Sequence, residues 1–312
     1  MTDQAASYAV RLTNRVATTS SFLCVGLDAS LAAIELLAPR SPGLRSGGAD
    51  GGGASRTFRA NAIERLCCAI IDAAAPHAAA VKPQLAHFEA AGAAGIAALE
   101  RVVAHARAAG LLVVLDAKRC DIPHSATAYA DAWLGAEASS GICGDALTVA
   151  VWPGPDTLAA FNEVARERGC AVYALVLTSN PGANAWLDAA DTRHPLWHDV
   201  ARTVEAAGAG AVIGATRPGT LARARELMPH APLLIPGIGA QGGSIEALAQ
   251  VACATAPPVL VNASRSLLPV APLTAHEFGV DVSRRIREVN VQLNAVLGSV
   301  LPAGIANGTP VG

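Results

Sequence analysis

Short apolar runs recur along the chain, separated by longer stretches that carry apolar residues on one face. The runs are rich in Val, Leu, Ile and Ala and lack the alternation of polar and apolar residues that marks a half-exposed strand. This pattern is typical of parallel strands that are covered on both faces. We therefore predict strands at Phe22–Leu27, Ala79–Val81, Leu111–Leu115, Ala146–Val149, Val172–Leu177, Ala211–Ile213, Leu233–Ile235 and Val259–Val261.

The stretches between these runs predict helices. Arg59–Ala75 shows the pattern most clearly, because Ile63, Leu66 and Ile70 fall on one side of a helix. A last helix is expected around His276–Leu297. The other predicted helices are Gly95–Ala108, Ala126–Leu134, Asp156–Arg168, Leu196–Ala206, Thr220–Leu227 and Ser244–Val251.

Eight strands that alternate with helices over roughly 250 residues match the order and length of a single (β/α)8 TIM barrel, an α/β fold. An open, doubly wound sheet is the structural alternative. That fold favours a Gly-x-Gly-x-x-Gly turn after the first strand, and Gly26-Leu-Asp-Ala-Ser does not fit it. We predict one catalytic barrel domain over residues 1–300.

Two segments do not follow the alternation of strands and helices. Residues 41–55 are dominated by Gly, Ser and Ala, so they bury too little surface to order themselves, and we predict a flexible insertion after the first strand. Residues 302–312 are expected to form a disordered tail.

The composition excludes several classes of protein. Of the 312 residues, 15% are charged, below the usual ~25%, and the net charge is −2 without any basic block. We therefore expect no nucleic-acid partner. The most apolar long stretch, Ala93–Leu115, is interrupted by Glu100, Arg101 and Arg107, so no membrane-spanning segment or membrane partner is expected.

The cysteines indicate the compartment. There are seven, an odd number, and none has Cys-x-x-Cys spacing, so neither a disulfide framework nor a zinc site is favoured. A reduced cytoplasm fits this usage best.

Charged residues gather at the end of one buried strand. In Leu111–Ile122, Asp116 and Lys118 stand two residues apart, which directs both side chains of an extended strand to the same side, and Asp121 follows. Lys and Asp are seldom buried unless they are paired. The cluster is either a catalytic site or an ion pair that closes the strand.

Polar or glycine residues follow nearly every predicted strand, and a barrel brings these strand ends onto one rim, where the active site of such barrels lies. Strand 7 leads into Pro236–Gly243 and strand 8 into Asn262–Ser266. Glycine-rich loops at these two places are the usual phosphate site, and Gln241 and Arg265 supply donors. Plain surface loops are the alternative; we favour a phosphorylated small molecule as the ligand.

Asp116-x-Lys118-x-x-Asp121-Ile122, preceded by Val81-Lys82-Pro83-Gln84, closely resembles the orotidine 5′-phosphate decarboxylase family. Further matches, in the order that the family has, point to its longer bacterial branch (type 2). They are Gly26-Leu-Asp28, Leu177-Thr-Ser-Asn-Pro181, Pro236-Gly-Ile-Gly-Ala-Gln-Gly-Gly243 and Val261-Asn-Ala-Ser-Arg265. The resemblance spans about residues 7–297.

The resemblance implies decarboxylation of orotidine 5′-phosphate to UMP and CO2, the last step of de novo pyrimidine biosynthesis, by a carboxy-lyase that needs no cofactor or metal. It implies a homodimer in which Asp121 serves the active site of the partner subunit. Lys82, Asp116, Lys118 and Asp121 would form the charged array, with Lys118 protonating a carbanion at C6.

The resemblance also implies substrate contacts. Asp28 would hold the ribose hydroxyls, Ser179 the pyrimidine, and Gln241 and Arg265 the phosphate. Ser125 takes the place of a usual threonine that contacts the ribose or phosphate. By their places in the matched motifs, the remaining expected substrate-binding residues are Ile122 and Pro236.

Some positions depart from the family pattern. Ala150-Val-Trp152 stands where the branch often has Asn-Pro-Tyr, so this rim contact is altered. Pro123 suits the first position of a helix. His124 is interpreted as a rim or interface residue and Cys120 as a packing residue, while the contacts of residues 182–193 are not assigned.

Two alternatives remain. A magnesium-dependent sugar-phosphate decarboxylase or aldolase of the same superfamily shares Asp-x-Lys-x-x-Asp, but such relatives place an acidic metal ligand where this chain has Lys82, whose ammonium repels Mg²⁺. A non-catalytic nucleotide-binding barrel would not need all four charged residues.

Overall fold

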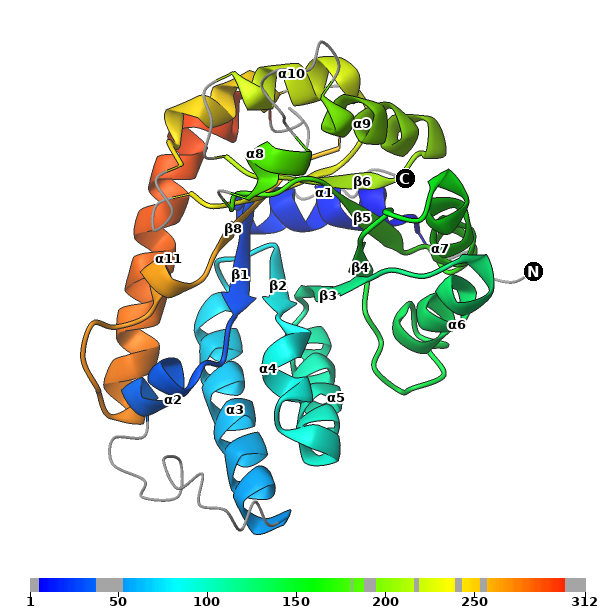
Figure 1. Ribbon diagram of the computed structural model, residues 1–312. Coiled ribbons are helices and arrows are strands. Elements are labelled where there is room, and N and C mark those ends of the chain that lie inside the picture. Colours follow the sequence, from blue (N-terminus) through cyan, green and yellow to red (C-terminus); the bar gives the residue numbers. More distant parts are fainter. Residues whose placement is uncertain are drawn as a thin grey trace.

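The computed structural model describes residues 6–37, 53–180, 182–187, 195–215, 219–238, 243–252 and 257–300. Within these ranges, eight strands form a closed barrel in which each strand pairs with the next and β8 pairs with β1, all in parallel (Figure 1). The predicted (β/α)8 barrel is confirmed. The strands are β1 Leu23–Leu27, β2 Ala80–Pro83, β3 Leu112–Arg119, β4 Ala146–Val149, β5 Ala171–Leu177, β6 Gly210–Ile213, β7 Leu233–Pro236 and β8 Leu260–Ala263.

Helices surround the barrel (Figure 1). The α-helices are α1 Tyr8–Thr19, α2 Leu31–Leu37, α3 Gly53–Ala74, α4 Leu85–Glu89, α5 Gly92–Ala108, α6 Pro123–Trp133, α7 Pro155–Glu167, α8 Ala183–Trp186, α9 Leu196–Ala207, α10 Thr220–Leu227 and α11 Ala275–Leu297. Short 3-10 helices are η2 Glu246–Val251, η3 Arg265–Leu267 and η4 Gly298–Val300.

The predicted strands and long helices agree with the structure, with three kinds of difference. Strand β3 continues past the predicted Leu115 to Arg119, so the charged cluster lies within the strand. The segment predicted as a helix at Ser244–Val251 is instead the 3-10 helix η2. Helices α1, α2, α4 and α8 were not predicted, because they are short or, in α1, show few apolar positions.

Local sequence explains where the helices begin. Pro123 and Pro155 occupy the first turns of α6 and α7, where a missing N–H costs nothing, which confirms the prediction for Pro123. Thr274 forms a capping box with Glu277 at the start of α11.

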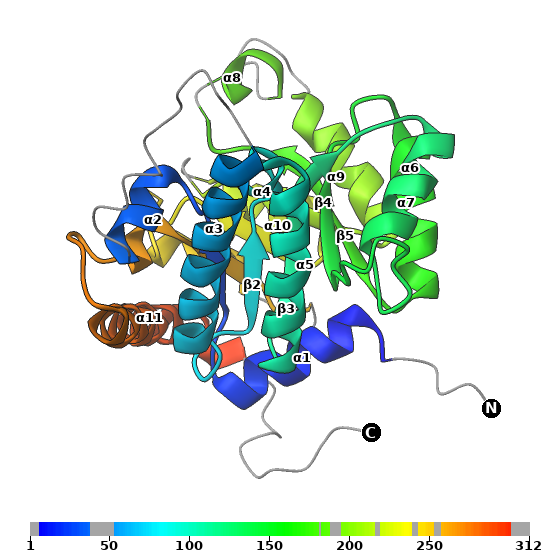
Figure 2. The same ribbon diagram turned by 90° about the horizontal axis from the view of Figure 1, so that it is seen from below.

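Helix α1 closes the amino end of the barrel. It buries Tyr8, Leu12 and Val16, and the Tyr8 hydroxyl lies 3.1 Å from that of Tyr173 in β5. Figure 2 shows α1 at one end of the molecule, with β2 pointing away from it toward the end where α8 lies. The opposite, carboxyl end of the strands is therefore the one available for a site.

The predicted flexible insertion lies mostly outside the described residues; its last three residues, 53–55, begin α3. The predicted tail, 302–312, also lies outside them. Among the described residues, no helix combines the length and apolar character needed to cross a membrane.

Candidate functional site

A buried carboxylate holds two ammonium groups at the carboxyl end of the barrel. Lys82 at the end of β2 donates its Nζ to Asp116 Oδ2 in β3 over 2.5 Å. Lys118, two residues further along β3, donates its Nζ to Asp116 Oδ1, also over 2.5 Å. The sequence spacing predicted that the Asp116 and Lys118 side chains point to the same side, and the family resemblance placed Lys82 with them. The structure brings all three together.

Two further donors complete the surroundings of the carboxylate. Gln84 Nε2 donates to Asp116 Oδ2 over 3.0 Å, and Thr148 Oγ1 in β4 donates to Oδ1 over 3.0 Å. Both residues were missed as site members. Their signals were present, because Gln84 follows Lys82 by two residues and Thr148 stands at a strand exit. Four donors thus fix the orientation of Asp116.

The charges of this cluster stabilise one another. Burial alone raises the pKa of Asp116, but the ammonium charges and hydrogen bonds of Lys82 and Lys118 outweigh it and lower the pKa from 3.8 to about 2. Burial lowers the pKa of Lys82, while Asp116 and then Asp28 raise it by more, so it ends above its usual value. Near neutral pH Asp116 is therefore a carboxylate and Lys82 an ammonium.

The two lysines differ in access. The Lys82 side chain is only 7% exposed, whereas that of Lys118 is 45% exposed. Lys82 is therefore suited to keep Asp116 ionised, and Lys118 to reach a bound molecule.

A cavity of about 250 Å³ opens on this array. It contains the predicted Ser179 and Pro236, so side chains from β2, β3, β4, β5 and β7 and the segments that follow them meet at one place. Its other lining residues are Lys82, Asp116, Lys118, Thr148, Leu175, Thr178, Asn180, Val212 and Leu234. The lining thus combines charged and polar side chains with apolar ones.

Four other predicted residues, Asp28, Asp121, Ile122 and Ser125, do not line this cavity. Asp28 is half-buried just after β1 and acts on Lys82 through its charge. Asp121 accepts a hydrogen bond from the backbone N–H of Ile122 over 2.8 Å, and it forms no ion pair within the described part of its own chain. Ile122 is 61% exposed, and Ser125 is half-buried in α6.

The two predicted phosphate loops are described in part. Gln241 lies outside the described residues. Gly237 has φ +96°, a backbone conformation that favours glycine, and a Cβ on Gly243 would approach Gly237 O to 2.7 Å. Arg265, at the start of η3, is exposed. Both described glycines, Gly237 and Gly243, therefore occupy positions where a larger residue would be strained or crowded.

Two sequence interpretations concern the rim. Cys120 is exposed, so its interpretation as a packing residue was wrong, because β3 ends at Arg119 and leaves Cys120 on the rim. His124 is exposed on the first turn of α6. Of residues 182–193, only 182–187 are described.

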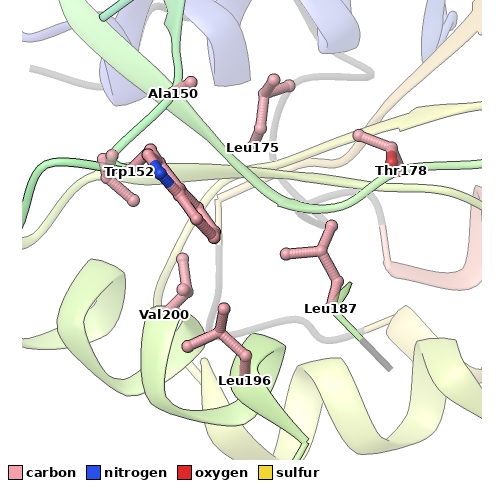
Figure 3. A pocket seen from close by; sticks show the side chains of 8 residues that line it. Ala150, Trp152, Leu175, Thr178, Leu187, Leu196 and Val200 are labelled. Atoms are coloured by element: carbon pink, nitrogen blue, oxygen red, sulfur yellow. The ribbon is translucent and has the colours of Figure 1, made fainter. Parts of the chain in front are cut away.

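A second, apolar pocket of about 440 Å³ adjoins the cavity, and the two share Leu175 and Thr178. Figure 3 shows the indole ring of Trp152 facing the side chains of Leu196 and Val200 from α9. Trp152 is 63% exposed. The altered segment Ala150–Trp152 therefore forms an apolar wall beside the cavity.

Comparisons with known proteins agree with this geometry. The sequence profile of the orotidine 5′-phosphate decarboxylase / HUMPS family matches residues 21–269. The orotidine 5′-phosphate decarboxylase of Rhodopirellula baltica is 38% identical over 307 residues, 93% of this chain and 99% of the relative. That of Deinococcus radiodurans is 39% identical over 269 residues, 84% of this chain and 89% of the relative.

Among solved structures, the OMP decarboxylase of Leishmania donovani is similar with a TM-score of 0.70 and 30% identity, covering 94% of this chain and 99% of the other. Sequence and fold thus agree over nearly the whole chain. The chain belongs to the orotidine 5′-phosphate decarboxylase / HUMPS family.

Proposed function

We propose that this chain decarboxylates orotidine 5′-phosphate to UMP and CO2, the last step of de novo pyrimidine biosynthesis. The observation that carries the proposal is the buried Lys82–Asp116–Lys118 array at the carboxyl end of the barrel. The relatives of this chain from Rhodopirellula baltica and Deinococcus radiodurans are named for this activity.

The chemistry needs a fixed positive charge beside the reacting carbon. When the bond from C6 to the carboxylate breaks, CO2 leaves and the electron pair stays on C6, where no adjacent carbonyl delocalises it well. The exposed ammonium of Lys118 stabilises this carbanion and then donates a proton to it. The resulting neutral amine regains its proton from solvent.

Asp116 has two functions in this scheme. It holds the Lys118 ammonium in place through the 2.5 Å hydrogen bond. It also presents a negative charge to the cavity, which disfavours the substrate carboxylate before it leaves. Lys82 keeps Asp116 ionised by pairing with its other oxygen.

The phosphate of the substrate would bind the loops after β7 and β8. The tight turn at Gly237 and the exposed guanidinium of Arg265 support this assignment, and Gln241 is expected to add a donor. Binding of the phosphate, which is remote from the reacting carbon, supplies binding energy that lowers the barrier at that carbon. Ser179 would contact the pyrimidine, Asp28 the ribose hydroxyls, and Ser125 the ribose or the phosphate.

The active enzyme is a homodimer in this proposal. Asp121 lies outside the Lys82–Asp116–Lys118 array of its own chain, next to the exposed Ile122. Both residues are therefore free to enter the site of a second copy. The cytoplasm is the expected compartment, because all six cysteines in the described part of the chain are free.

The magnesium-dependent alternative is less well supported. Lys82 places an ammonium at the end of β2, and this ammonium occupies Asp116 Oδ2. A divalent cation there would face repulsion from Lys82 and from Lys118. No specific contact favours this second reaction.

The test is conversion of orotidine 5′-phosphate by the purified chain, followed by ultraviolet absorbance with and without EDTA. We expect UMP to form at the same rate in both. Loss of activity in EDTA would favour the magnesium-dependent reaction, and tight UMP binding without turnover would favour a non-catalytic barrel.

A further inference from the structure

One hydroxyl group links the carboxylate and the backbone of the site. Thr148 in β4 is 1% exposed and lines the cavity. Its Oγ1 donates to Asp116 Oδ1 over 3.0 Å and accepts from the backbone N–H of Lys118 over 3.0 Å. A hydroxyl has one proton and two lone pairs, so one group satisfies both partners.

The backbone of Lys118 needs such support. Its φ of +47° lies in the left-handed region, which is unfavourable for a residue other than glycine. The pairing register between β3 and β4 shifts between Leu115 and Arg119, on either side of this residue. Strained conformations of this kind persist only where surrounding contacts hold them.

Two sets of contacts hold this segment, one made by the next residue, Arg119, and one made by Lys118 itself. Arg119 pairs with Glu89, and its guanidinium lies 5.5 Å from the ring centre of Tyr129 and 5.8 Å from that of Trp133. Thr148 binds the N–H of Lys118 itself. Of these contacts, only that of Thr148 also reaches the carboxylate that holds the Lys118 ammonium.

We propose that Thr148 is a positioning residue. Its bridging hydroxyl fixes the strained backbone of Lys118 relative to the carboxylate of Asp116, so that the Lys118 ammonium faces the reacting carbon. This rests on the proposed function. Thr148 acts through Asp116 and Lys118 and is not itself assigned a contact with substrate.

Two substitutions distinguish the contribution of the Thr148 hydroxyl from that of the shape of its side chain. Thr148→Val keeps the shape but removes both hydrogen bonds, whereas Thr148→Ser keeps the hydroxyl and loses a methyl group. Ile70→Val, in α3 and distant in the fold from the strand ends, is a control for a small loss of core packing.

We expect T148V to lower kcat by about 10- to 100-fold, as the loss of a hydrogen bond to a charged group allows, while KM and the Kd of UMP change less than about threefold. T148S should keep kcat within about threefold of the wild type, and I70V should leave it unchanged. Equal kcat values for T148V and the wild type, or equal losses in T148V and T148S, would overturn the proposal.

A crystal structure of T148V tests the same idea without any activity. Lys118 should leave the left-handed region, or its Nζ should move away from Asp116 Oδ1; an unchanged Lys118 would contradict the proposal. If the wild type does not convert orotidine 5′-phosphate, the proposed function fails, while this structural result still decides the role of Thr148.

Discussion

Removing Lys82 should destabilise the protein, because it leaves a buried carboxylate without one of its two ammonium partners. We consider Lys82→Met, which keeps the length of the stem. The Asp116 and Lys82 side chains are 8% and 7% exposed and their charged atoms are 2.5 Å apart.

The size of the effect follows from the pKa of Asp116. Its decrease from 3.8 to about 2 corresponds to about 2 kcal/mol in favour of the ionised form, net of burial. Without Lys82, the burial penalty is offset by one ammonium, that of Lys118, and by the neutral donors Gln84 and Thr148. We therefore expect a loss of about 3 kcal/mol in the free energy of unfolding, in the range for breaking a buried pair.

Urea denaturation and thermal unfolding measure this change. With an unfolding entropy of about 2.1 cal/mol/K per residue over 312 residues, the loss corresponds to a fall in Tm of about 5 °C. The matched variant K82M/D116N, which also removes the carboxylate charge, should recover part of the loss. A loss under about 1 kcal/mol in K82M, or no recovery in the double variant, would refute the reasoning.

Three further predictions concern the same array. Lys118→Ala should lose nearly all turnover in the UMP-formation assay yet still bind UMP by calorimetry; near-normal turnover would refute its assignment as proton donor. Because the folded pKa of Asp116 lies below its usual value, its contribution to stability is complete above about pH 4 and is lost as the pH falls through about 2. Urea unfolding between pH 5 and pH 2.5 should show this loss in the wild type and not in Asp116→Asn. Asp121→Asn and Lys118→Ala should each be inactive, but mixing them should restore part of the activity, because one site of a hybrid dimer is intact; no recovery on exchange of subunits would argue against a shared site.

The fold could be predicted from sequence because its signal is repeated. Eight apolar runs separated by helical stretches leave few alternatives, and the strands are found within a few residues of the predicted positions. Helix α1 was missed, because its buried face consists only of Tyr8, Leu12 and Val16 among Ala and polar residues. Its function in closing the barrel depends on contacts with Tyr173, distant in sequence.

The site could be predicted only in part. Lys82, Asp116 and Lys118 meet because they end neighbouring strands, which the strand order implies. The left-handed Lys118 could not be foreseen, since no glycine marks it and the conformation depends on the pairing of β3 with β4. The bridging function of Thr148 follows from that same pairing, so sequence spacing alone does not reveal it.

The roles of Asp28, Asp121, Ile122, Ser125, Gln241 and Arg265 stay predictions. Asp121 and Ile122 act, in the proposed scheme, in a second copy of the chain, so one chain cannot show their contacts. Gln241 lies outside the described residues. Arg265 is exposed, and the partner proposed for it is the phosphate of the substrate. These are contacts that a bound substrate and a partner subunit would complete.

The most direct test of the central claim is the yield of UMP from orotidine 5′-phosphate, measured by ultraviolet absorbance with EDTA present, for the wild type and for K118A in parallel. We expect the wild type to convert all the substrate to UMP and an equal amount of CO2, and K118A to form almost none. No conversion by the wild type, or equal conversion by both proteins, would contradict decarboxylation by the Lys82–Asp116–Lys118 array.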